Sequence, residues 1–333
     1  MIAGLYWLAI FFEWIFFGSQ LMNKMKFALV PLCFLMFVVA ACKSAQVEES
    51  VPEVNPLALL GNDSSIYVNV PVQSHKSLTA DLIRSQVEGL SAKDAAALCE
   101  KVNNIYIGIG TVKDRSRLEI SSSTKSIPRG PFNALLKKSN GWIDHEFSGK
   151  NSTYRIFENS KSKIQLSLLS PKVLCASKNV GLLAGAFDER KELDPTEYND
   201  WVSQDSNDIL FYITRPGQYL RAFIGAPINI ATEAVYGKMI YAGTISKNGK
   251  NVETYNMTLR VRVREKKLVA ALKSLISLSF GMAGGNVAVI DDFTLEVSGI
   301  ELSKNQVEDL FLRDPITGKK YVVVGDEVIE VRE

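Results

Sequence analysis

Few residues in this chain have the types and spacing that catalysis or metal binding requires. The 333 residues include only two histidines, His75 and His145, and neither has a second histidine or a cysteine at a metal-ligand spacing. Asp144 could orient the imidazole of His145, but the polar surroundings favour a solvated turn. The sequence holds no serine-hydrolase, zinc-protease or Walker-type motif. We therefore expect no catalytic residue, no metal, no cofactor and no enzyme activity.

Two glycine-rich runs and one acidic pair have structural explanations. GIGTV (108–112) lies inside a strand pattern, and GMAGG (281–285) follows a helix pattern, whereas a dinucleotide-binding loop must precede its helix. The first run therefore indicates close backbone packing, and the second indicates the end of a helix. Asp291 and Asp292 come directly before a strand pattern and indicate a turn.

The most informative cysteine, Cys42, ends an apolar run. Lys24 and Lys26 precede the apolar residues 27–41. This is the layout of a secretory signal, because a membrane-spanning helix needs about 20 apolar residues. Small residues then lead to the thiol in the sequence Val39, Ala40, Ala41, Cys42, and they keep the backbone accessible to a peptidase. The basic start, the apolar residues and the small residues before Cys42 together predict that the protein is exported.

The VAAC sequence (39–42) resembles the lipobox of bacterial lipoproteins, with valine in place of the usual leucine, as in the relaxed lipoboxes of spirochaetes. The resemblance covers residues 25–42. It implies that Cys42 carries acyl chains such as palmitate and becomes the mature N-terminus. Since each buried CH₂ contributes about 0.8 kcal/mol, several chains form a stable membrane anchor. The body would then lie in the periplasm or at the cell surface, on either the inner or the outer membrane.

Composition and patterning divide the chain into four parts. Residues 1–41 form the leader, whose upstream part is either an over-extended start or a first membrane helix; Glu13 disfavours the helix because a charge is costly in hydrocarbon. Residues 42–56 form the anchor and a polar, proline-containing tether. Residues 57–200 and 201–333 form two folded modules, the second ending in a hairpin over 319–333.

The fold class we expect is α+β. NIYIGIG (104–110) is echoed by MIYAGTI (239–245), and strand patterns follow both. We therefore predict two similar modules, each an antiparallel sheet with helices packed on one face. In this repeat, residues 219–239 take a helical position, and 240–263 form two strands around an Asn-Gly turn at 248–249.

The helix pattern over 266–280 is the main functional clue in the body. Leu268, Leu272, Leu275 and Ile276 share one face, which either packs on the sheet or contacts a membrane or an apolar ligand. Cys99 and Cys175 are compatible with a disulfide and equally with two buried free thiols.

The charge of the chain bears on its partners. The net charge of +2 provides no global field for nucleic acid, so we expect none bound. Our leading hypothesis is an envelope lipoprotein that acts as a non-catalytic binding or assembly module, with a lipid or an envelope protein as partner. The alternatives are a lipid carrier and an enzyme with an unrecognised site.

Overall fold

The computed structural model describes residues 54–86, 91–111, 114, 117–138, 141–160, 163–216, 231–247, 249–281, 285–312, 320–324 and 327–331. The predicted leader, the lipobox with Cys42 and most of the tether lie outside the described residues. In the described part, every helix is too short or too polar to cross a bilayer.

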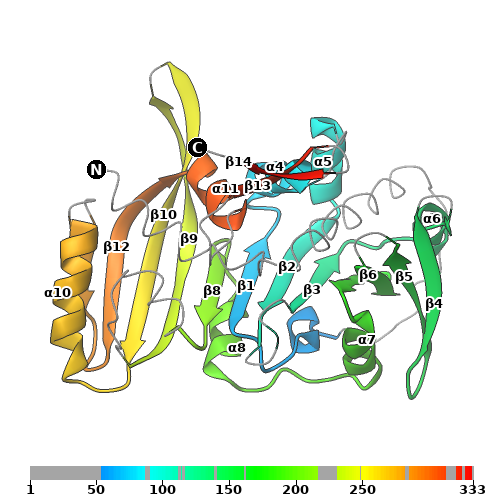
Figure 1. The fold of residues 1–333 in the computed structure, drawn as a ribbon, viewed down its shortest axis with the longest axis horizontal. Helices are drawn as coiled ribbons and strands as arrows, with labels where there is room; N and C mark the ends of the chain where they lie inside the picture. The colour runs from blue at the N-terminus through cyan, green and yellow to red at the C-terminus, as the bar shows by residue number, and fades with distance from the viewer. Residues whose placement is uncertain are drawn as a thin grey trace.

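Twelve antiparallel strands form one sheet that runs the length of the molecule (Figure 1). Its order is β11-β12-β10-β9-β8-β1-β2-β3-β7-β6-β5-β4. The strands of the first half are β1 (Ile66–Pro71), β2 (Val102–Ile109), β3 (Leu118–Thr124), β4 (Trp142–Ser148), β5 (Thr153–Asn159), β6 (Gln165–Ser170) and β7 (Val173–Ser177). Those of the second half are β8 (Ile209–Ile213), β9 (Thr232–Lys247), β10 (Lys250–Val263), β11 (Asn286–Val289) and β12 (Thr294–Ser303).

The two halves of the chain meet at the centre of this sheet, where β1 pairs with β8 from Ile66↔Ile213 to Asn69↔Leu210. The antiparallel α+β architecture agrees with the predicted fold class. The separate sheet predicted for each module is wrong, because hydrogen bonds between β1 and β8 continue one sheet across the boundary. That the halves repeat each other stays a prediction.

Helices cover both faces of the sheet, and this corrects the prediction of helices on one face. The larger core lies under α4 (Lys76–Gln86), α6 (Arg129–Leu135), α10 (Leu268–Gly281) and α11 (Lys304–Leu312). The core of the opposite face lies under the 3₁₀ turn Pro56–Leu59, α7 (Val180–Asp188) and α8 (Glu197–Val202). Strands in the middle alternate between the cores: Val68 faces the first and Tyr67 the second. Because the central strands bury apolar side chains on both faces of the sheet, helices must cover both faces.

The predicted helix over 219–239 is wrong in its described part, because residues from Thr232 onward form β9. Val235 and Met239 face the first core, while Ala234 and Tyr236 face the second. A run that is apolar on both faces can be read as helix or strand from sequence, and pairing with β8 and β10 decides for the strand.

Two further elements complete the described part. Helix α5 (Ala92–Cys99) packs beside α4. The strands β13 (Lys320–Val324) and β14 (Glu327–Val331) form a separate two-stranded sheet, which agrees with the predicted C-terminal hairpin.

Candidate binding groove

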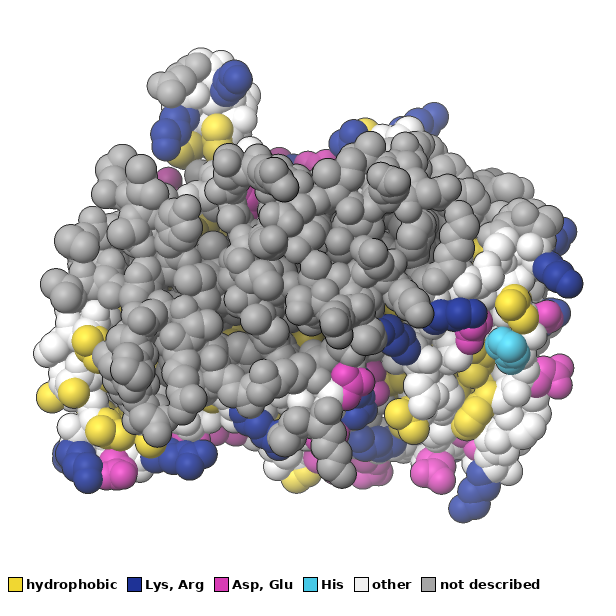
Figure 2. Space-filling model, viewed as in Figure 1, with side chains coloured by type: hydrophobic (Ala, Val, Ile, Leu, Met, Phe, Trp, Pro, Cys, Tyr) yellow, Lys and Arg dark blue, Asp and Glu magenta, His cyan; other side chains and the backbone are white. Residues whose placement is uncertain are grey.

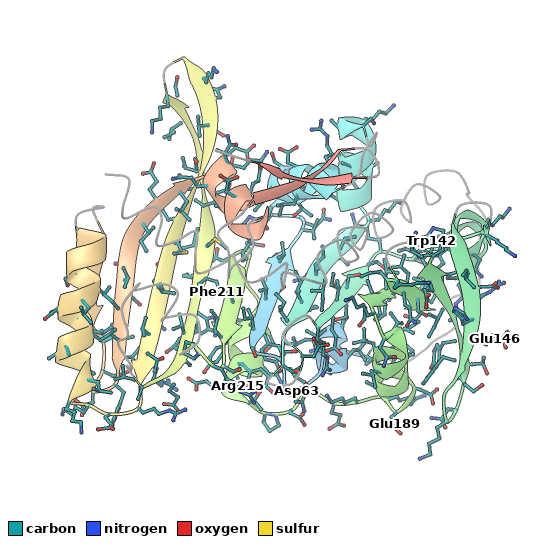
Figure 3. The ribbon with its side chains drawn as sticks, viewed as in Figure 1. Asp63, Trp142, Glu146, Glu189, Phe211 and Arg215 are labelled. Atoms are coloured by element: carbon teal, nitrogen blue, oxygen red, sulfur yellow. The ribbon has the colours of Figure 1, made fainter. Side chains whose placement is uncertain are left out.

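An open groove of about 590 Å³ lies between α7 and the edge strand β4. Its apolar lining includes Phe147 from β4 and Leu182 and Ala186 from α7, and Leu182 is 56% exposed. Trp142 and Glu146 mark the course of β4, and Glu189 marks the end of α7 (Figure 3). A concave, mostly apolar surface of this size is typical of a small-molecule binding site.

Two glycines of α7 open the space beside Phe147. A Cβ atom on Gly181 would lie 3.1 Å from Cδ2 of Phe147, which is tighter than an ordinary contact. A Cβ atom on Gly185 would lie 3.8 Å from Cζ of Phe147, so side-chain atoms fit there but would occupy the groove. The absence of side chains at these two positions therefore lets the Phe147 ring lie against the helix and leaves the groove open.

One face of helix α7 is buried in the second core, and this packing holds the helix in place. Val180, Leu183 and Ala184 have no exposed surface and pack in the second core with Cys175 of β7. Burying a leucine of this kind contributes about 1.5–3 kcal/mol. The helix therefore provides a firm wall for the groove.

The end of α7 is tied to the turn between β4 and β5 by Asp188. This carboxylate accepts hydrogen bonds from the backbone N–H of Asn151 at 2.7 Å and from the hydroxyl of Tyr154 at 3.0 Å. These donors, the Asn151 amide above all, lower the pKa of Asp188. The ionised carboxylate thus sets the spacing between α7 and the β4–β5 hairpin.

The charged end of the groove carries Glu189 and Lys191. The Lys191 ammonium donates to Oδ1 of Asn62 at 2.9 Å and contacts the carbonyl of Leu60 at 3.4 Å, so it is anchored to the turn before β1. Glu189 is exposed. The lining is therefore mostly apolar, with Asn179 at the start of α7 and the charged Glu189 and Lys191 beyond its end, and it suits an apolar ligand with a polar head.

The four predicted contact residues of α10 lie at the other end of the sheet. Leu272 is fully buried and Ile276 is 9% exposed, both in the first core, and Leu268 packs against that core. Leu275 is half-buried. In this structure the apolar face of α10 therefore packs on the sheet, and contact with a membrane or ligand would require the helix to move.

Cys99 and Cys175 are both free and buried, so the structure corresponds to the alternative of two separate thiols. Burial raises the pKa of Cys99 to about 11 and also raises the pKa of Cys175. Thiols with raised pKa values are poor nucleophiles at neutral pH.

The acidic residues considered for chemistry, Asp144, Asp291 and Asp292, have structural partners. His145 is exposed on β4, and its neighbour Asp144 pairs with Arg155 at 2.6 Å instead of orienting the imidazole. The predicted turn around His145 is a strand. Asp291 accepts from the backbone N–H of Phe293, and Asp292 pairs with Lys266, which agrees with the predicted turn.

The groove residues were not among the sequence predictions. Helix α7 (VGLLAGAFD) is apolar on every side and contains two glycines, so it lacks the periodicity that indicates an amphipathic helix. The sequence feature that could have indicated the groove is the spacing of Gly181 and Gly185, which are four residues apart and therefore lie on one helical face. Strand β4 has a single buried residue, Trp142, because it lies at the sheet edge.

The comparison with family models and the comparison with solved structures both lead to TP0453. The family model described as outer membrane-associated lipoprotein TP0453 matches residues 52–306. The chain is similar to crystal forms I, IV and III of TP0453, with TM-scores of 0.56, 0.55 and 0.56 at 17%, 16% and 16% identity. The matches cover 78% of this chain and 97%, 96% and 98% of those chains. No curated protein matches the chain significantly.

Proposed function

The chain belongs to the family of the outer membrane-associated lipoprotein TP0453, and we propose that it is a non-catalytic binding module held at the envelope membrane through Cys42. Family membership agrees with the lipoprotein resemblance of the leader. The observation that carries the binding role is the groove between α7 and β4, with its exposed Leu182 and its glycine-lined wall. The ligand we propose is an apolar molecule with a polar head, such as a lipid.

The proposed anchor places the groove near a bilayer. Val54, the first described residue, follows Cys42 by twelve positions. Even fully extended, this segment spans at most about 40–43 Å. A body on so short a tether stays close to the membrane that holds the acyl chains, where lipids are abundant.

Ligand binding is tested by identifying what leaves the cell with the protein. We expect organic extraction and mass spectrometry of the purified protein to recover a lipid from the wild type and at least ten-fold less from Gly185→Leu, whose side chain fills the groove. Gly130→Leu is the matched control, because Gly130 also lies in a helix and has no atom within 4 Å of an added Cβ. Equal lipid in all three proteins, or in none, would contradict the groove as the site.

The anchor is tested separately with a palmitate analogue. Cells that express the wild type should incorporate label into the protein, and cells that express Cys42→Ala should not. Persistence of the label in the variant would disprove attachment at Cys42. Fractionation of the labelled cells would also assign the protein to the inner or the outer membrane.

A further inference from the structure

The strands β9 and β10 continue beyond the sheet as a projecting hairpin (Figure 1). β8 pairs with β9 only up to Met239, and β12 pairs with β10 only from Thr254 onward. The segments 240–247 and 250–253 therefore have no second neighbouring strand among the described residues. An isolated two-stranded hairpin is marginally stable in water. Its length and its surface thus need an explanation other than the packing of the core.

One face of this hairpin combines an apolar pair with a basic pair. Ile245 lies directly opposite Val252, and the next pair on the same face is Lys247 opposite Lys250. Ile245 is 42% exposed. Gly249, in the turn, has φ +73°, the left-handed conformation that such a tight connection requires. Basic side chains gather at the tip beside apolar ones (Figure 2).

The two lysines at the tip repel each other. Like charges directly opposite in a sheet are destabilising, and both lysines are exposed. The acid nearest to them in the hairpin, Glu253, lies toward its base and accepts a hydrogen bond from the hydroxyl of Ser77 at 2.8 Å. An external anion between Lys247 and Lys250 would remove this repulsion.

The apolar pair and the basic pair lie on the same face of the hairpin, so a bilayer surface that meets this face contacts both pairs at once. A lysine side chain holds its ammonium group at the level of lipid phosphates while apolar atoms near it enter the interface. Basic residues close to anionic lipids strengthen such contacts. The membrane association of the family places a bilayer within reach of the protein.

We propose that the tip of the β9–β10 hairpin, with Lys247, Lys250, Ile245 and Val252, is a second, non-covalent contact with an anionic phospholipid surface. The proposal rests on the membrane association in the proposed function, and it is independent of the groove. Contact at the tip together with the acyl anchor would fix the orientation of the body on the bilayer.

The test uses the lipidated protein with Ile245→Cys labelled by an environment-sensitive dye. Cys99 and Cys175 are buried and Cys42 is acylated in the proposed form, so the label goes to one site. Vesicles of phosphatidylcholine alone are compared with vesicles that also contain phosphatidylglycerol. We expect a blue shift of the dye emission on the anionic vesicles and a much smaller one on the neutral vesicles.

Charge reversal at the tip provides the second part of the test. Lys247→Glu with Lys250→Glu should abolish the shift, whereas Lys137→Glu with Lys138→Glu, the same charge change at two exposed lysines near β4, should preserve it. A dye that stays in water on both kinds of vesicle would overturn the proposal, as would a shift that survives reversal at the tip. Flotation of the protein with the vesicles is measured in parallel: failure to float refutes the anchor, whereas floating without a shift refutes only the hairpin contact.

Discussion

The two ends of the long sheet differ in how their faces are covered. At the β4 end, α6 covers one face and α7 the other, and the groove forms where α7 stands over the edge strand. At the β11 end, α10 and α11 cover one face, and the second core includes no described residue of β10, β11 or β12. Among the described residues, the groove forms where a helix lies over the outermost strands, whereas the second face of β10 carries polar side chains in place of a core.

The face of β10 that points away from the first core is built from polar side chains. Arg260 and Arg262 are half-buried and alternate with the buried Val261 and Val263, so the arginines lie on the opposite face of the strand from the first core. Arg260 pairs with Glu296 of β12 at 2.9 Å. Partly exposed ion pairs contribute little to stability, so we expect substitutions here to be mild.

The largest expected effect is the loss of stability when a buried leucine is truncated, and one leucine from each end of the sheet tests it. Leu183 of α7 and Leu272 of α10 are both fully buried, so Leu183→Ala and Leu272→Ala should each lower the free energy of unfolding by about 2–5 kcal/mol. Chemical denaturation measures both. If Leu272→Ala cost less than about 1 kcal/mol, α10 would not pack firmly on the sheet, and a membrane role for its apolar face would gain support.

The next effect depends on pH and concerns His75, near the base of the hairpin. Its Nε2–H donates to the carbonyl of Asn207 at 2.8 Å, its Nδ1 is buried without a partner, and its ring stacks on Tyr255. Burial lowers the pKa of His75 below its ordinary value of 6.5, so the unfolded chain binds the proton more readily. Stability should fall as the pH drops below 6.5, by at most about 1.4 kcal/mol per pH unit.

Denaturation between pH 7.5 and pH 5 checks this effect, with His75→Gln as the comparison. The variant should lose less stability across the interval than the wild type. Asp188, at the groove end, provides the contrast: its lowered pKa stabilises the fold above the ordinary range of a carboxyl group, and that contribution disappears only in stronger acid. Identical slopes for the wild type and His75→Gln would contradict the role of this histidine.

A smaller effect distinguishes the two groove glycines. Gly185→Ala should raise the free energy of unfolding by about 0.5–1 kcal/mol, because alanine favours the helix and its Cβ meets only an ordinary contact. Gly181→Ala should gain less or lose stability, because its Cβ would press on Phe147. Thermal and chemical denaturation of the two variants measure the difference, and equal gains would show that Phe147 does not lie against α7 at Gly181.

The smallest expected change in stability concerns the polar face of β10. Arg262 pairs with Glu197 at 2.6 Å and lies over the ring of Tyr236. We expect Arg262→Ala to cost about 0.2–1 kcal/mol, since Glu197 is about half exposed to solvent. A loss above 2 kcal/mol would mean that this face is a structural core and not a solvated surface.

Sequence reasoning located the elements with a clear period. The helix α10 and the hairpin around Gly249 each follow the expected pattern, because one face of the helix is buried on the sheet and because the turn residues of the hairpin are diagnostic. The joining of the halves through β1 and β8 could not be predicted, since pairing between strands remote in sequence leaves no local signal. Helix α7 was missed because it is apolar on all sides.

The candidate site was less accessible to sequence reasoning than the fold. Phe147 and Gly181 are 34 positions apart and meet only because β4 and α7 lie at the same end of the sheet. The sequence instead directed attention to the leucines of α10, where burial now accounts for Leu272 and Ile276. Spacing on one helix identifies an apolar face but does not show what covers it.

The most direct test of the account is photo-crosslinking with a long-chain fatty acid that carries a diazirine in its tail. After irradiation and digestion of the purified protein, mass spectrometry locates the modified peptides. We predict modification within 142–148 and 180–191, the segments that form the groove, and loss of it in Gly185→Leu but not in Gly130→Leu. Modification confined to 268–281 would contradict the account and assign ligand binding to α10.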